Sequence, residues 1–536
     1  MNVSLTIDAR PVEVEAGQTL LTAARKLGIE IPTLCHHEKC TPSTSCLVCL
    51  VKVKGNGGGR LVPSCATVAE PGMEVESETA EVFEARRTAL ELLFSDHVGD
   101  CLSPCHRICP LQLNIPLMLR QVDRKQFAEA VATVRTAVPL AGVTGWLCGA
   151  PCEQGCRRGV ADQPAAIREV ERFVAEHATD QDPPWLPPCA ADTGKSVAIV
   201  GAGPTGLLAA HELRRAGHAV TVYDRHPEPG GSLLREVAAD RLPAETLQRE
   251  LDRLRRMGIG FRPDTELGRD LALDSLRNDH DAVLLALGKN GRARARELGL
   301  VLAPSGVKVD PTTFLTARGR VFAAGALTKT LNQVVRALAE GRAAAHAIRQ
   351  FLAGQVIQRL PKPFSSIMGK TSPTEVAQFM AGAPKIGRVQ PSRGAQKGFL
   401  PQEAACEASR CLHCDCRSEG HCALQRYAEQ YGVDPNRFRG DRRPFEQHLE
   451  HGEIIFEPGK CILCGICVKL AEQAREPLGL TFIGRGFDVK VGVPFSREID
   501  EGLQKVAREC VEACPTGALV FKDDHLRQTP RMSPHP

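Results

Sequence analysis

The chain opens with alternating apolar and polar positions. Val3, Leu5 and Ile7 alternate with polar residues, which predicts a strand, and a turn at Asp8–Pro11 leads into a second short strand. The period then changes to that of a helix over Leu20–Leu27. The first residues therefore predict a strand hairpin followed by a helix.

Two helical patterns and a strand–helix–strand pattern follow. Glu81–Phe94 and Gln126–Ala137 are amphipathic with helical period, so we expect residues 80–176 to be largely helical. Lys195–Val200 is a short apolar strand, and a glycine-rich turn and a helix separate it from a second strand at Val220–Tyr223. The middle of the chain thus predicts a βαβ unit.

Breaks in these patterns suggest domain boundaries. Asp180–Pro188 contains prolines that lack backbone donors and restrict their neighbours, which predicts a linker. Residues 352–400 contain proline, serine and glycine with little periodicity, and we expect a connecting arm there. The predicted divisions are 1–78, 80–176, 195–352, 353–452 and 453–522.

Charge and hydropathy argue against nucleic acid binding, membrane insertion and export. The 536 residues hold 67 Lys+Arg against 63 Asp+Glu, and this near balance, without a long basic run, argues against nucleic acid. Membrane insertion is not expected, because no uninterrupted apolar stretch of about 18 residues occurs. Asp8 and Arg10 interrupt any apolar core of an export signal. A cytoplasmic protein is therefore expected.

Cysteine is the unusual residue. The chain has 22 cysteines in tight groups, with none between Cys189 and Cys406. Disulfide frameworks belong to small secreted chains, so groups of this kind in a long chain favour metal binding. Zinc stays open as an alternative to iron, because a C-x2-C pair suits a tetrahedral zinc site equally well.

The first cysteine group has the order C-x10-C-x2-C-x15-C, formed by Cys35, Cys46, Cys49 and Cys65. It resembles the [2Fe–2S] domain at the start of the large iron–sulfur subunit of respiratory complex I and of related hydrogenase and formate dehydrogenase subunits. The resemblance implies a β-grasp fold for residues 1–78, with these four thiolates as ligands. Cys40 is left over.

The second group consists of two C-x3-C-x3-C runs, the first of which ends in Cys-Pro: Cys101, Cys105 and Cys109, then Cys148, Cys152 and Cys156. It resembles the N-terminal iron–sulfur domain of the glutamate synthase small subunit and of dihydropyrimidine dehydrogenase. Those relatives hold two [4Fe–4S] clusters, which need eight ligands. His97 continues the spacing backwards, and Glu171 lies where the family places a ligand other than cysteine. We expect both to complete the set if two clusters form.

The βαβ unit carries the signature G-x-G-x-x-G followed by an acid at the end of the second strand, formed by Gly201, Gly203, Gly206 and Asp224. These glycines let backbone approach a pyrophosphate at a helix N-terminus, and the acid accepts from a ribose hydroxyl. Dinucleotide binding is predicted.

FAD is indicated by two further pieces that resemble flavin disulfide-reductase-type folds. They are Pro229-Gly230-Gly231 and the return Val321–Gly325. In those families an Asp that holds the flavin follows the last glycine, whereas Ala326 stands here. Glutamate-synthase-type relatives also insert an NAD(P)H-binding unit before this return. Only Lys289–Arg320 are available for it, and a βαβ unit alone needs about 30 residues. The NAD(P) domain is expected to be missing.

Two cysteine groups end the chain. The first, C-x2-C-x-C-x5-C, resembles C-terminal extensions of glutamate-synthase-like flavoproteins and comprises Cys411, Cys414, Cys416 and Cys422. It suffices for a [4Fe–4S] cluster or zinc, and the crowded C-x-C favours iron. The second resembles bacterial-type ferredoxin modules and comprises Cys461, Cys464, Cys467 and Cys514. Because Ala471, Gln504 and Ala507 replace the second set of ligands, one cluster is expected there.

These patterns predict a multidomain α+β and α/β chain: a β-grasp [2Fe–2S] domain, a helical [4Fe–4S] domain, a Rossmann-like FAD domain lacking the NAD(P) domain, and a C-terminal bacterial ferredoxin-like domain. One [2Fe–2S] and three [4Fe–4S] clusters are expected, with a fourth [4Fe–4S] if His97 and Glu171 both serve.

The expected function is an electron-transfer subunit of a larger soluble oxidoreductase complex of the formate dehydrogenase or hydrogenase kind. No catalytic residue is predicted, and the partners would be a catalytic subunit and an NADH-binding flavoprotein subunit. Two alternatives stay open: a stand-alone NAD(P)H-dependent acceptor oxidoreductase, and a zinc-stabilised scaffold.

Overall fold

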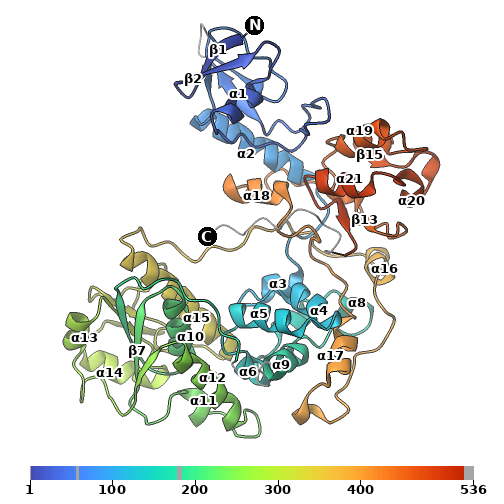
Figure 1. Cartoon of the computed structure of the whole chain (residues 1–536). Coiled ribbons are helices and arrows are strands. Elements are labelled where there is room, and N and C mark those ends of the chain that lie inside the picture. Colours follow the sequence, from blue (N-terminus) through green and yellow to red (C-terminus); the bar gives the residue numbers. More distant parts are fainter. Residues whose placement is uncertain (1, 56–58, 178–183, 524–536) are drawn as a thin grey trace. The chain divides into compact units, whose positions relative to one another are not determined.

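Two compact units make up the computed structural model, which describes residues 2–55, 59–177 and 184–523 (Figure 1). Unit 1 holds Met1–Ser103, Pro363–Gly382 and His413–Pro536, and unit 2 holds Pro104–Lys362 and Ala383–Leu412. The chain therefore leaves unit 1 twice and returns to it twice.

The start of unit 1 is a five-stranded sheet in the order β2-β1-β5-β3-β4. Its elements are β1 (Asn2–Ile7), β2 (Arg10–Glu15), α1 (Leu20–Lys26), β3 (Leu50–Val53), β4 (Arg60–Pro63) and β5 (Glu74–Glu76). β1 pairs antiparallel with β2 and parallel with β5. The apolar residues of β1 are buried as their alternation predicts, and Thr19 caps α1 by accepting from the Thr22 backbone N–H. The predicted hairpin and helix are confirmed.

The rest of unit 1 combines a long helix with a small C-terminal fold. Its helices are α2 (Ala80–Ser95), α16 (Pro373–Ala381), α18 (Ala423–Gln430), α19 (Ile466–Gln473), α20 (Ile499–Gly502) and α21 (Ala507–Ala513). Two antiparallel ribbons complete it: β13 (Ile454–Phe456) with β16 (Leu519–Phe521), and β14 (Thr481–Ile483) with β15 (Lys490–Gly492). One apolar core joins α2, α18, α19 and α21 to the loop that holds Cys35 and Cys46.

Unit 2 begins with seven helices, as the predicted helical segment requires. They are α3 (Pro104–Ile108), α4 (Ile115–Asp123), α5 (Phe127–Ala137), α6 (Ala141–Leu147), α7 (Pro151–Gln154), α8 (Arg158–Ala161) and α9 (Ile167–His177). The expected linker follows, and its residues 180–183 lie outside the described part of the chain.

A parallel sheet in the order β12-β9-β6-β7-β8 forms the second part of unit 2. Its strands are β6 (Ser196–Val200), β7 (Ala219–Tyr223), β8 (Gly260–Arg262), β9 (Ala282–Leu285) and β12 (Val321–Ala323). The flanking helices are α10 (Pro204–Arg215), α11 (Ser232–Arg235), α12 (Ala244–Arg256), α13 (Leu273–Asp279), α14 (Arg292–Glu297) and α15 (Val334–Leu352). Helix α17 (Pro401–Ala408) packs instead on α4 and α9 of the helical segment. A short ribbon, β10 (Leu302–Ala303) with β11 (Gly306–Val307), precedes β12.

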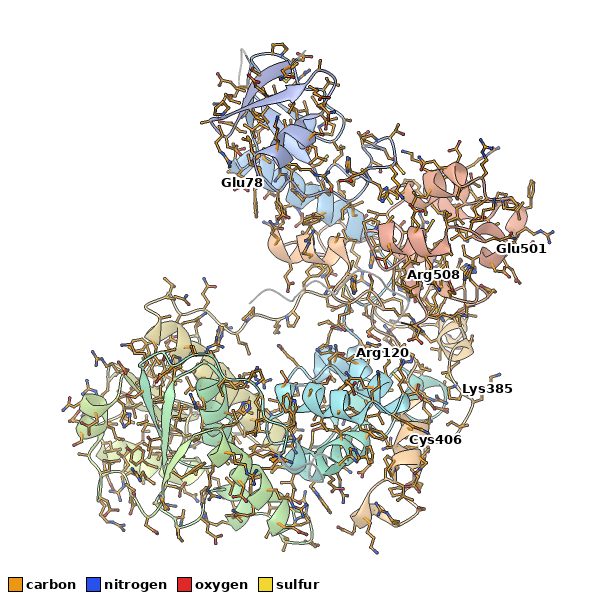
Figure 2. The ribbon with its side chains drawn as sticks, in the orientation of Figure 1. Glu78, Arg120, Lys385, Cys406, Glu501 and Arg508 are labelled. Atoms are coloured by element: carbon orange, nitrogen blue, oxygen red, sulfur yellow. The ribbon has the colours of Figure 1, made fainter. Side chains whose placement is uncertain are left out.

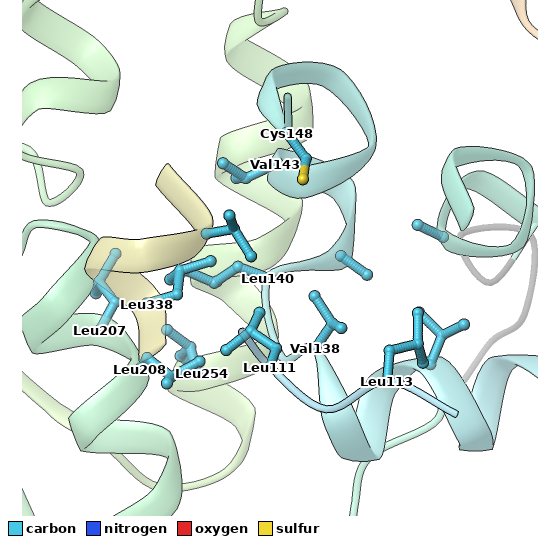
Figure 3. Close-up of a cluster of buried hydrophobic side chains, with 14 of the residues drawn as sticks. Leu111, Leu113, Val138, Leu140, Val143, Cys148, Leu207, Leu208, Leu254 and Leu338 are labelled. Carbon is cyan, nitrogen blue, oxygen red and sulfur yellow. The ribbon is translucent and has the colours of Figure 1, made fainter. Parts of the chain in front are cut away.

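One hydrophobic core joins the sheet to helices of the cysteine-bearing segment. Figure 3 shows Leu207 and Leu208 of α10, Leu254 of α12 and Leu338 of α15 facing Leu140 and its neighbours in the helical segment. These side chains are buried, so the nucleotide-type sheet and the cysteine-bearing helices of unit 2 share their packing.

The expected connecting arm contains a helix. Ser372 and Glu375 form a capping box at the start of α16, in which each side chain accepts from the other residue's backbone N–H. The pattern Ser-Pro-Thr-Glu at 372–375 carries this signal in the sequence.

No single helix in the described ranges is long and apolar enough to cross a bilayer. Helices α5 and α6, which meet at an angle of 85°, reach that length and hydropathy only together.

Candidate functional site

The first thiol group lies in unit 1, where Cys35, Cys46, Cys49 and Cys65 are all buried. Hydrogen bonding from the Cys46 and Cys65 thiols lowers the pKa of Cys35 to about 2, and the Cys65 thiol lowers that of Cys49 to about 7. The pKa of Cys46 and of Cys65 is raised, mainly by the interaction with Cys35. Thiols this close favour thiolate at part of the site, which is the form that ligates iron.

The second group lines a cavity in the C-terminal fold of unit 1. Cys461, Cys464, Cys467 and Cys514 face a pocket closed by Phe456, Ile466 and Leu519. The Leu463 backbone N–H lies 3.4 Å from Cys461 Sγ, as a cluster ligand requires of its surroundings. An apolar pocket with four converging thiols fits a cubane cluster.

These two groups are neighbours within unit 1. Cys35 raises the pKa of Cys464, although burial is the larger cause, so the two thiols interact electrostatically. The Lys469 ammonium of α19 donates to the Thr41 carbonyl and to Ser43 Oγ at 2.6 and 2.8 Å, which fixes the loop between Cys35 and Cys46 on the C-terminal fold. The contact brings two predicted redox sites together.

Glu171 stands beside three cysteines of unit 2. Burial raises the pKa of this carboxyl to about 7, and the Thr144 hydroxyl donates to its Oε1. The charge of Glu171 in turn raises the pKa of Cys109, Cys148 and Cys152, after burial as the main cause. Glu171 is a buried acid beside Cys148 and Cys152, which are buried, and the half-buried Cys109, and a bound cation would stabilise its charge.

Cys101, Cys416 and Cys422 come together in unit 1 from segments far apart in the chain. The Cys416 backbone N–H donates to the Cys101 carbonyl at 3.1 Å. All three thiols are buried, and Cys422 Sγ, at the N-cap of α18, accepts from the Gln425 N–H at 3.4 Å. Cys422 also lies near Cys514, because the Leu424 N–H donates to the Pro515 carbonyl at 3.2 Å.

The remaining predicted ligands are distributed as follows. His97 is in unit 1; burial and then the Lys460 charge lower its pKa to about 3, and its buried Nδ1 has no hydrogen-bond partner among the described residues. Cys105, Cys156 and Cys411 belong to unit 2, and Cys414 to unit 1. The Arg158 guanidinium donates to the Arg410 carbonyl at 2.7 Å, which ties the segment after Cys156 to the one before Cys411.

A buried ion pair adjoins the thiols of unit 1 and was not predicted. Lys460 and Glu457 are each about 3 % exposed and hydrogen-bonded to each other. Burial works against the charge on Lys460, but the Glu457 carboxylate and Cys416 outweigh it and hold the pKa of Lys460 above its ordinary value. The sequence carries no signal for this pair, because lysine is rarely buried.

The glycine-rich turn of unit 2 follows β6 and leads into α10. A Cβ at Gly206 would lie 2.0 Å from the Gly201 carbonyl oxygen, and one at Gly201 (φ +110°) would lie 2.3 Å from that of Ala286. Gly203, by contrast, has only Gly231 Cα near its added Cβ, at 3.9 Å, and it caps α10 without a side-chain acceptor. The first turn of α10 therefore keeps free backbone donors, which suits a pyrophosphate.

Asp224 and Ala326 also lie near this turn. Asp224 is buried and accepts from the Ala202 and His226 backbone N–H groups at 2.7 and 2.9 Å, so it braces the turn. After β12, the Arg292 guanidinium donates to the Ala326 carbonyl at 3.4 Å. Gly325 packs on Thr205 of α10, where a Cβ would lie 2.5 Å from Oγ1.

The spacing of the thiols bears on the choice between zinc and iron. A single zinc ion draws its sulfur ligands to about 2.3 Å from one point. In the described part of the chain, no three His, Cys, Asp or Glu side chains gather tightly enough for one metal ion. The four thiols of Cys461, Cys464, Cys467 and Cys514 line one pocket together with apolar side chains, which fits an iron–sulfur cluster.

Known families match three parts of the chain. Residues 1–80 match a 2Fe-2S iron-sulfur cluster binding domain, and residues 81–183 match dihydropyrimidine dehydrogenase domain II with its 4Fe-4S cluster. Residues 199–250 match an NAD(P)-binding Rossmann-like domain. The chain is an iron–sulfur protein with a Rossmann-like domain. The expected cofactor classes are thereby confirmed, while the number of clusters stays a prediction.

Curated relatives match over part of their length. The NADP(+)-dependent formate dehydrogenase subunit beta of Moorella thermoacetica is 35% identical over 36% of this chain and 30% of its own. The glutamate synthase [NADPH] small chain of Mycobacterium tuberculosis is 38% identical over 35% of this chain and 39% of its own. The NADPH-Fe(3+) oxidoreductase subunit beta of Geobacter sulfurreducens is 31% identical over 46% and 36%. The alignments thus span about a third of these relatives.

One solved structure aligns along most of the chain. The NAD+-reducing [NiFe]-hydrogenase in the H2-reduced state covers 97% of this chain and 88% of its own, at 13% sequence identity and a TM-score of 0.35. A superposition at that TM-score supports no inference about function.

Proposed function

We propose that this chain is an electron-transfer subunit that relays electrons through iron–sulfur clusters and FAD within a larger oxidoreductase complex. One observation carries the proposal. In unit 1 the thiol groups adjoin one another. Lys469 ties the loop between Cys35 and Cys46 to the fold that holds Cys464, Cys464 and Cys514 line one pocket, and the bond from the Leu424 N–H to the Pro515 carbonyl brings Cys422 near Cys514. Adjacent one-electron centres in series make a conduit, and no substrate needs to reach them.

The finer fold assignments belong to the same proposal. The sheet order and the helix of the first segment support a β-grasp [2Fe–2S] domain, and the four-thiol pocket supports a bacterial ferredoxin-like module at residues 453–522. The ligands we propose are those expected from the sequence, with Glu171 beside Cys109, Cys148 and Cys152. Bound iron would supply the electron carriers. The chain's own residues exclude water from them and orient the thiols.

FAD is the nucleotide we propose for the Rossmann-like domain. The open position at Gly203 and the free donors of α10 would hold its pyrophosphate, and Asp224 would accept from its ribose. Between β9 and β12 the chain forms only short elements, α14 with β10 and β11, which supports the absence of a second nucleotide domain. Electrons would then enter or leave through clusters, and a catalytic subunit and an NADH-binding flavoprotein subunit are the partners.

A second candidate is a stand-alone NAD(P)H-dependent acceptor oxidoreductase. The match of residues 199–250 to an NAD(P)-binding domain favours it. In this case the nicotinamide nucleotide itself would occupy the turn at Gly203.

An anaerobic titration separates the two candidates. The full chain, with its clusters and flavin, is titrated with NADH, NADPH and dithionite while flavin absorbance and cluster EPR signals are followed together. A relay subunit is reduced by dithionite but by neither nucleotide. Rapid reduction by stoichiometric NADH or NADPH without a partner protein would reject the relay and establish the second candidate.

A further inference from the structure

We infer that His97, Cys101, Cys416 and Cys422 hold one [4Fe–4S] cluster, with histidine as its fourth ligand. This assignment joins two segments that the spacing of the cysteines places in different clusters. It rests on the proposed function only in that the sites hold iron. Its test does not depend on electron transfer to any partner.

The segment that holds Cys101 contacts the segment that holds Cys416. The Cys416 N–H donates to the Cys101 carbonyl at 3.1 Å, and both residues belong to unit 1. Ser366 fixes the other side of Cys101, because its hydroxyl lies 3.4 Å from Cys101 Sγ and donates to the Gly99 carbonyl at 2.8 Å. The Cys101 thiol is thus held at a defined place beside Cys416.

The thiols of Cys101, Cys416 and Cys422 are all buried. Cys101, Cys416 and Cys422 are 6, 6 and 7 % exposed, and each of the last two thiols interacts electrostatically with Cys101. These three buried thiols form no disulfide with one another, so all three can bind a metal cluster. The N–H of Gln425 directed at Cys422 Sγ adds the kind of donor that stabilises a cluster thiolate.

His97 shares a neighbour, Lys460, with this group of thiols. The Lys460 side chain lies against Gly99, two residues after His97, because a Cβ at Gly99 would lie 2.7 Å from Lys460 Cε. The same side chain lies near Cys416, because a Cβ at Gly517 would lie 3.6 Å from Lys460 Cδ and 2.4 Å from Cys416 Sγ. The Lys460 charge also acts on His97. Because the buried Nδ1 of His97 has no partner among the described residues, it is available as the fourth ligand.

The combined sequence pattern agrees with this grouping. Without the 104–412 interval, the ligands read His-x3-Cys before it and Cys-x5-Cys after it. Unit 2 therefore interrupts one cluster-binding segment. The assignment takes Cys416 and Cys422 away from Cys411 and Cys414, and Cys101 away from Cys105 and Cys109.

Iron analysis of single and double variants tests the grouping. In the full chain, C101A and C416A each lose the same cluster EPR signal and about four iron atoms, and the double variant loses no more than either alone. Separate clusters would instead cost the double variant about eight iron atoms, and that result would overturn the assignment. Loss of the same signal in C411A would overturn it as well. C406A is the matched control, because Cys406 is exposed on α17 (Figure 2).

Pulsed EPR tests the histidine. With 15N-labelled histidine, the reduced cluster of the native chain shows a nitrogen coupling that changes with the isotope. His97→Cys keeps the iron, loses this coupling and has a lower reduction potential, because a thiolate adds negative charge where a neutral imidazole stood. A coupling that persists in this variant would exclude His97 as a ligand. The visible circular dichroism of the [2Fe–2S] centre reports whether each variant is folded.

Discussion

A buried carboxylate holds the Rossmann-like sheet to the cysteine-bearing helices inside unit 2, and its removal gives a sharp prediction. Glu250 of α12 is 2 % exposed and hydrogen-bonded to Arg135 of α5. Its other oxygen accepts from the Gly142 N–H at 2.8 Å, in the first turn of α6, and Arg253 lies 3.3 Å away. One carboxylate thus serves two buried guanidinium groups and a helix N-terminus.

The change Glu250→Ala leaves both cations without their carboxylate. Arg135 keeps only the carbonyls of Pro139 and Ala175, at 3.3 and 3.2 Å. Breaking a buried pair by removing one partner costs about 3–5 kcal/mol, because the remaining charge stays desolvated. For a unit of this size each kcal/mol lowers the melting temperature by about 2–4 °C, so a decrease of about 6–20 °C is expected.

The assay is an anaerobic thermal melt that follows release of bound flavin. Glu245→Ala is the control on the same helix: its carboxylate is exposed and pairs with Arg249 one turn away, which is worth about 0.3–0.5 kcal/mol. If E250A and E245A melt within about 2 °C of each other, the buried charge does not stabilise unit 2 as argued.

Three shorter predictions concern the cofactor sites. Gly203→Ala keeps a melting temperature near that of the native chain but binds no flavin. Gly206→Ala, whose Cβ would lie 2.0 Å from a carbonyl oxygen, lowers both the melting temperature and the amount of bound flavin. Thermal melting and flavin absorbance measure the two quantities. Glu171→Ala loses one cluster EPR signal and leaves the [2Fe–2S] signal unchanged, and an unaltered set of signals would refute its role. Lys460→Met with Glu457→Gln, measured by redox titration, lowers the potential of the adjoining cluster, because the Lys460 cation acts on Cys416 more strongly than the Glu457 carboxylate does and no longer stabilises the reduced, more negative state.

Local patterns predicted the elements well. The alternation of Val3, Leu5 and Ile7 became β1, and the pattern of Glu81–Phe94 became α2, because in both cases the apolar positions of the pattern form a buried face. The glycine turn between β6 and α10 was also predictable, since its geometry depends on neighbouring residues alone.

The ligand grouping that we propose for Cys101, Cys416 and Cys422 was not predictable from spacing. Spacing groups cysteines that are close in the chain, and it joined Cys416 and Cys422 to Cys411 and Cys414. The backbone contact of Cys416 with Cys101 joins residues that are about 315 positions apart in the chain. No periodicity records such long-range contacts, and the same holds for the ion pair of Lys460.

A cluster whose ligands lie on both sides of unit 2 makes assembly of that site depend on the folding of unit 2. Cys101 and Cys416 are about 315 positions apart, and the entropy of closing a loop grows only with the logarithm of its length. Compared with a three-residue loop, the added cost is about 4 kcal/mol if the intervening chain is unfolded. A folded unit 2 removes most of that cost, because its chain is already ordered. Destabilising unit 2 through E250A, at a temperature where it is partly unfolded, should therefore reduce iron incorporation at Cys101 and Cys416 while the [2Fe–2S] site, formed within residues 35–65, assembles normally. Equal loss at both sites would show that unit 1 does not assemble in this order.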